Sequence, residues 1–176
     1  MGVNMAAITL LDVSHAVAAV SSTTTVTVNA AFLQEIKEVN AELWKLLHDM
    51  RSLCSRPEAI RRRVNETVAM LSRLQDQLAM HFSLEEYYGY FDDPVSVAPR
   101  LSQKAVALRA EHRTLYLDIA AIVDRAEHLL YHRRWDRLVR HIALRFNGFY
   151  DQLKAHEHAE NELILEAFDD DLGVGD

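Results

Sequence analysis

Apolar residues recur in steps of three and four along most of the chain, which is the pattern of amphipathic helices. The repeat predicts four helices, over residues 30–54, 57–91, 100–130 and 135–168. Asn29 suits the N-cap of the first helix, and Pro57 suits the first turn of the second. Short connections between amphipathic helices are typical of an all-α, up-down-up-down four-helix bundle.

The two ends of the chain lack this repeat. Residues 1–28 end in SSTTTVTV, which is poor helix-forming material, so they are expected to be a disordered N-terminal tail. The bundle is expected over 29–169, and an acidic C-terminal tail over 170–176. A loop carrying Pro94 and Pro99 is expected between the second and third helices.

Composition supports this fold class and narrows the partners. The chain has 5 glycines and 3 prolines in 176 residues, against a usage of roughly 12% for the two together, so a turn-rich β fold is disfavoured. A net charge of −7 argues against nucleic acid and anionic membranes as partners. Cys54 is the single cysteine, which favours a reducing, cytoplasmic location. No apolar run reaches the ~18 residues of a membrane span.

Ionisable residues interrupt the apolar stripes of three predicted helices. The second helix carries His81 and Glu85, the third carries His112, and the fourth carries His156 and Glu160. Each His-Glu pair is four residues apart and therefore shares one helix face. Burial of such groups costs several kcal/mol each unless they pair or bind a cation. Nitrogen and carboxylate ligands suit iron, manganese or zinc, so the stripes predict a metal site, most simply a dinuclear iron site.

Two further histidines compete for this role. His158 and Glu162 share the same spacing, but His158 lies about 200° around the helix from His156, so His156 and Glu160 are preferred. His48 lies about 160° from the apolar face of the first helix and is expected at the surface or on a second face beside Trp44, although a role as the ligand of that helix stays open.

The order of these motifs resembles that of the hemerythrin-like (HHE cation-binding) domains over about residues 30–168. The resemblance is carried by His81-Phe-Ser-Leu-Glu85-Glu86, by the run Leu108–Leu115 around His112, and by His156-Glu-His-Ala-Glu160. It implies a non-haem centre of two iron ions, or one, that binds dioxygen or another small diatomic or peroxide ligand. The implied roles are oxygen or redox sensing or iron handling, with an unknown protein partner in the case of a sensor.

Two positions depart from the family pattern. Aligning the first helix on the third places Asn40 at the position of His112, where the family has a histidine. Tyr116 stands where oxygen carriers have a second histidine on the third helix, which argues against oxygen carriage. Asn40 and Tyr116 are therefore candidates for weak ligands or for hydrogen-bonding partners of the ligands.

Other classes of protein fit less well. Ferritin-like di-iron proteins carry Glu-x-x-His, and no glutamate of this chain has a histidine three residues later. The His-Glu-x-x-His motif of zinc hydrolases is also missing from the sequence. The alternative that stays open is a helical interaction module with a partly lost metal site. A binding role is favoured over an enzyme, although a di-iron centre that reacts with oxygen or peroxide stays open.

Overall fold

A computed structural model describes the backbone of residues 30–172 and the side chains of residues 40–167. The chain divides into two compact units, Met1–Gln34 and Glu35–Asp176, and the helices below belong to the second unit apart from the start of α2. The expected tail over 1–28 lies outside the described residues, as do residues 173–176.

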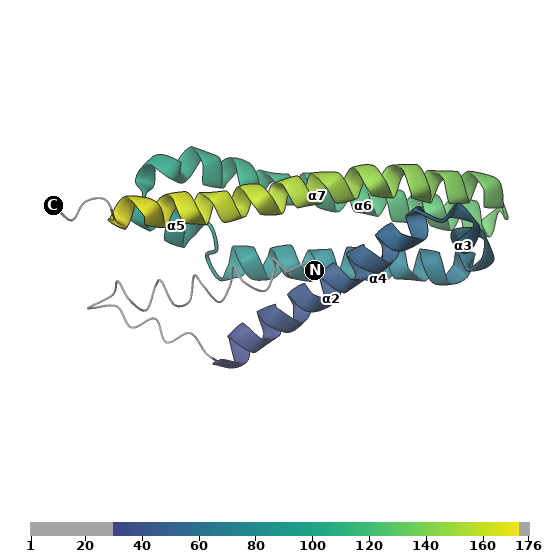
Figure 1. Ribbon diagram of the computed structural model, residues 1–176, viewed down its shortest axis with the longest axis horizontal. Coiled ribbons are helices and arrows are strands. Elements are labelled where there is room, and N and C mark those ends of the chain that lie inside the picture. The colour runs from purple at the N-terminus through teal and green to yellow at the C-terminus, as the bar shows by residue number, and fades with distance from the viewer. Residues whose placement is uncertain (1–29, 173–176) are drawn as a thin grey trace. The chain divides into compact units, whose positions relative to one another are not determined.

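The described residues form helices and contain no strand, which confirms the all-α prediction. The helices (Figure 1) are α2 (Ala30–Cys54), α3 (Pro57–Arg62), α4 (Val64–Tyr87), α5 (Asp92–Val97), the 3-10 helix η1 (Pro99–Leu101), α6 (Ser102–Tyr131) and α7 (Trp135–Leu172). The long helices α6 and α7 run side by side, and α4 packs against α6.

The second predicted helix is wrong as a single element. It divides at Arg63, whose backbone (φ −128°, ψ 39°) leaves the helical region, while its N–H still bonds to the carbonyls of Ala59 and Ile60. The two parts take different partners, because α3 packs against α7 whereas α4 packs against α6. The change of direction therefore lets both parts reach the core.

The connection between α4 and α6 is also more ordered than predicted. Gly89 ends the preceding helix in the left-handed region (φ 73°), which favours glycine, and α5 and η1 follow in place of a plain loop. Pro94 stands in the first turn of α5, where it breaks no helical hydrogen bond, and it is buried. Tyr88 follows the end of α4 at Tyr87 and is 43% exposed.

The fourth helix is longer than expected. It continues to Leu172, so the beginning of the segment 170–176 is helical rather than tail. The turn before it needs no glycine or proline, because Arg133 itself adopts a positive φ of 53°.

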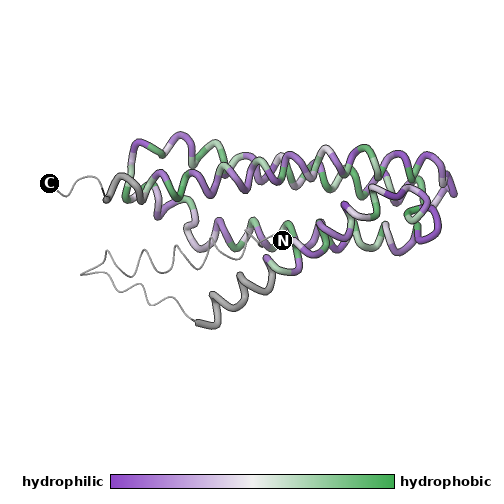
Figure 2. Tube along the Cα trace, in the orientation of Figure 1, coloured by the Kyte–Doolittle hydropathy of each residue, from purple (hydrophilic) through white to green (hydrophobic). Residues whose placement is uncertain are grey.

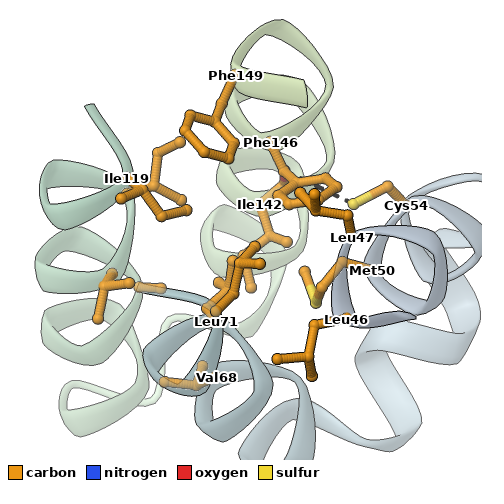
Figure 3. Packing of buried hydrophobic residues seen from close by; sticks show 14 of the residues in the cluster. Leu46, Leu47, Met50, Cys54, Val68, Leu71, Ile119, Ile142, Phe146 and Phe149 are labelled. Atoms are coloured by element: carbon orange, nitrogen blue, oxygen red, sulfur yellow. Dashed lines mark hydrogen bonds between the residues drawn. The ribbon is translucent and has the colours of Figure 1, made fainter. Parts of the chain in front are cut away.

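Two apolar clusters make up the core. The apolar residues that recur in steps of three and four along α6, from Ala105 to Leu129, are buried. The larger cluster joins residues from Leu43 on α2 to Leu153 on α7, and the smaller gathers around Phe91, Leu108 and Leu163. Figure 3 shows the larger cluster, where the Cys54 thiol points at the carbonyl oxygen of Ile142 at 4.0 Å. Burial raises the pKa of this thiol to about 12, so it stays protonated at neutral pH.

Figure 2 shows hydrophilic and hydrophobic residues alternating along each helix rather than a uniformly hydrophobic one. In the part of the chain that the structure describes, no helix combines the length and the hydropathy that a membrane crossing needs.

Phe146 tests the packing of the larger cluster, because its ring is fully buried. Phe146→Ala should lower the free energy of unfolding by about 3–5 kcal/mol, from lost burial and the cavity left behind. Its near neighbour Leu144 is 75% exposed, so Leu144→Ala is the control and should change stability by no more than about 0.5 kcal/mol. Urea unfolding followed by circular dichroism measures both, and equal effects would contradict this packing.

Candidate metal centre

Three buried histidines lie on three helices and come together in one layer. His81 on α4, His112 on α6 and His156 on α7 have 5%, 2% and 3% of their surface exposed. Along α6, Leu108 of the smaller apolar cluster precedes His112, and Leu115 of the larger cluster follows it. The histidines therefore occupy a polar layer between the two clusters, where side chains have little access to water.

The tightest group in this layer is formed by His112, His156 and Glu160. One ligand atom from each lies within 4.8 Å of the others, and all three residues are buried. Glu160 Oε1 is 3.1 Å from His112 Nε2 and 3.0 Å from His156 Nε2. Both imidazoles thus direct Nε2 at the same carboxylate oxygen.

His81 and Glu85 lie next to this group. His81 Nε2 is 3.1 Å from Glu85 Oε1, and Glu85 Oε2 is 3.5 Å from His112 Nε2. Glu157 Oε1 also approaches His81 Nε2, at 2.9 Å. All five residues predicted from the sequence are therefore in one layer, with Glu85 in contact with the histidines of both α4 and α6.

Carboxylates at the outer edge hold two of the imidazoles in place. His112 Nδ1 lies 3.1 Å from Glu86, and His156 Nδ1 lies 2.9 Å from Glu111. When the imidazole is neutral, a carboxylate that accepts a hydrogen bond from Nδ1–H leaves the lone pair on Nε2, which faces inward. This is the arrangement that a metal-binding histidine needs.

Two phenylalanines wall the layer. The ring of Phe82 stacks on His112 with the centroids 4.0 Å apart and the planes 9° apart, and it meets His156 edge-on at 5.9 Å. Phe91 contacts His112 from another direction, at 5.4 Å. These rings fix the imidazole planes and keep the surroundings of the carboxylates apolar.

Burial changes the acidity of Glu85. It raises the pKa of this carboxyl well above its usual range, and the negative charges of Glu160, Glu157 and Glu86 raise it further. Without a cation in the layer, burial and these neighbouring charges therefore favour the protonated form of Glu85.

Glu160 and His156 shift each other's pKa in opposite directions. Burial raises the pKa of Glu160, but the contacts with His112 and His156 outweigh it, and the resulting pKa lies below the ordinary value. Burial lowers the pKa of His156, but Glu160 and Glu111 outweigh it, and the resulting pKa is raised. The pair is thus stabilised as carboxylate and imidazolium when no metal is bound.

The donor atoms present fit a metal ion. Glu85 Oε2 and His156 Nε2 are buried and have no hydrogen-bond partner among the described residues. Glu85 Oε2 nevertheless lies 3.5 Å from His112 Nε2, and His156 Nε2 lies 3.0 Å from Glu160 Oε1. These are nitrogen and oxygen donors of the kind that bind iron, manganese or zinc.

The other candidates from the sequence lie elsewhere. Tyr116 packs on the larger cluster, and its hydroxyl accepts a hydrogen bond from Gln75 at 3.3 Å. Asn40 is partly buried, and its Oδ1 has no hydrogen-bond partner among the described residues. His48 is exposed on α2.

The competing pair on α7 stays in solvent. His158 and Glu162 lie 3.3 Å apart with side chains 74% and 55% exposed. They face away from the layer that holds His156 and Glu160, as the helical geometry requires.

Several residues of the site were missed in the sequence. Glu86, Glu111 and Glu157 were not predicted, although each is the immediate neighbour in sequence of a predicted ligand. That adjacency was the available signal. Tyr90 was also missed, because it follows the turn at Gly89: burial raises the pKa of its phenol well above the usual range, and the charges of Glu160, Glu85 and Glu157 add to the effect.

These shifts predict that the metal-free protein loses stability as pH rises above the ordinary glutamate value of 4.5. The pKa of Glu85 is raised in the folded state, so ionisation above the unfolded value near 4.5 costs stability. His156 acts in the same sense, because its contribution is present below the unfolded value near 6.5 and is lost as pH rises through its raised pKa. Glu160 has a lowered pKa, so its contribution is lost only as pH falls below about 4.5 and does not oppose the trend.

Urea unfolding with a chelator at pH 5, 6.5 and 8 measures this slope. Glu85→Gln should reduce the slope, because the amide cannot ionise. Glu162→Gln is the control, since Glu162 is 55% exposed, and should keep the wild-type slope. A wild-type slope in Glu85→Gln would contradict the assignment.

Comparison with protein-family models, with curated proteins and with solved structures finds no match to this chain. The residues of the polar layer are therefore the basis of the functional assignment.

Proposed function

We propose that the chain is an up-down-up-down four-helix bundle of the hemerythrin-like type and that it binds non-haem iron, as a pair of ions, in its interior. The observation that carries the proposal is the convergence of His112, His156 and Glu160, with buried ligand atoms mutually within 4.8 Å. The order of the His and Glu motifs along the chain supports the same assignment.

The charges in the layer favour a cation over a purely structural cluster. Glu85, Glu157 and Glu160 are 12%, 16% and 2% exposed at their side chains, and histidine nitrogens are their close partners. Three carboxylates at this depth cost several kcal/mol each unless positive charge offsets them. A divalent cation offsets this charge while each imidazole keeps a lone pair for the ion.

Each residue of the site has a part in this function. His112, His156 and Glu160 would hold one ion, and Glu85 would extend the site toward His81. Iron supplies one-electron redox chemistry and affinity for dioxygen, peroxide or another small diatomic molecule. The rings of Phe82 and Phe91 limit the access of water to the ligands.

Sensing of oxygen or redox state, or iron handling, fits the donor set better than oxygen carriage. The layer has three imidazoles, and Tyr116, at the position of a fourth, pairs with Gln75 instead. A sensor of this kind acts in the cytoplasm and passes its signal to a separate protein partner. An interaction module with a partly lost site is the second candidate, and Asn40 on the first helix is the observation that favours it.

His112→Ala tests the proposed ligand set against a neutral histidine. The substitution should lower the iron content of anaerobically loaded protein to below about one tenth of the wild-type value, because it removes a nitrogen that faces two glutamates. His48→Ala, at an exposed position on α2, should keep the wild-type content. Retention of iron by His112→Ala, or its loss from His48→Ala, would contradict the assignment, and a metal-free wild type would favour the interaction module.

Glu111→Gln tests the outer carboxylates. Glu111 contacts Nδ1 of His156, and loss of such a partner typically weakens metal binding by about 10–100-fold. Glu162→Gln is the control, because the side chains of Glu111 and Glu162 are almost equally exposed, at 53% and 55%. Anaerobic titration with Fe(II) measures the affinities. Equal affinities for both variants would show that Glu111 does not support metal binding.

A further inference from the structure

We infer that Glu157 is a metal ligand and that, with His81 and Glu85, it forms a second cation position beside that of His112, His156 and Glu160. The inference deepens the proposed function and rests on it. It assigns the second ion of the pair to a residue outside the His-x-x-x-Glu motifs.

The position of Glu157 is the first argument. It follows His156 directly on α7, yet its Oε1 crosses to α4 and lies 2.9 Å from His81 Nε2. Its side chain is 16% exposed, far less than the 55% of Glu162 one and a half turns later. Glu157 therefore directs its charge into the polar layer.

The contacts of His81 are the second argument. Its single Nε2 atom faces two carboxylate oxygens, Glu85 Oε1 at 3.1 Å and Glu157 Oε1 at 2.9 Å. A single proton, whether it sits on His81 Nε2 or on the carboxyl of Glu85, must serve all three of these atoms. A divalent cation that accepts the lone pair of Nε2 and a lone pair from each oxygen satisfies all three groups at once.

Glu85 links the two positions. Its Oε1 belongs to the contact with His81, whereas its Oε2 lies 3.5 Å from His112 Nε2 and has no hydrogen-bond partner among the described residues. The two oxygens of one carboxylate thus face histidines on different helices, as in a carboxylate that bridges two ions.

The two positions differ in how close together their ligand atoms already lie. His112, His156 and Glu160 already place their ligand atoms mutually within 4.8 Å. At the second position, Glu85 and Glu157 each contact Nε2 of His81, at 3.1 and 2.9 Å. The carboxylates must draw together around the second ion, so we expect that ion to bind more weakly than the first.

Anaerobic titration of the full chain with Fe(II), followed by calorimetry and by iron analysis after gel filtration, tests the inference. The wild type should bind one equivalent tightly and a second at least tenfold more weakly. Glu157→Gln should retain the first and lose the second, and so should His81→Gln, whereas Glu162→Gln should retain both. Far-UV circular dichroism verifies that each variant is folded.

The outcomes separate this inference from the proposed function. A wild type that binds one equivalent, or a Glu157→Gln variant that binds two with wild-type affinities, overturns the role of Glu157 and leaves the first position intact. Loss of both equivalents in Glu157→Gln overturns the division into two positions. A wild type that binds no iron overturns the proposed function itself.

Discussion

The presence of three carboxylates and three imidazoles in the interior is the constraint on which the rest of this structure depends. Glu85, Glu157 and Glu160 share one layer with the histidines of α4, α6 and α7, between two apolar clusters. Burying such groups is expensive unless their charges are matched. Each histidine Nε2 meets at least one carboxylate oxygen within 3.1 Å, so the layer is organised to hold positive charge at its centre.

The fold around this layer serves to position it. Helix packing sets the register of α6 against α7, and the two apolar clusters fix His112 and His156 from both sides along the helix axes. The outer carboxylates Glu86 and Glu111 orient the rings, and Phe82 stacks on one of them. A metal ion bound here would contact side chains of α4, α6 and α7 at once.

Helical periodicity predicted much of this from the sequence. The facing of His81, His112, His156 and Glu160 follows from steps of three and four, because a long amphipathic helix has one buried side. The break at Arg63 and the short helix α5 could not be predicted, because they depend on which helix each segment packs against. Glu157 was missed for a related reason: its reach from α7 to α4 depends on the separation of two helices, which no repeat encodes.

The central claim is that the polar layer binds a cation in the folded state, and the melting temperature of the full chain tests it most directly. Fe(II) added anaerobically at about 100 times its dissociation constant should stabilise the fold by about 2.7 kcal/mol. For a domain of this size that corresponds to a rise of roughly 5–10 °C. A melting temperature unchanged by Fe(II) at neutral pH would contradict the claim.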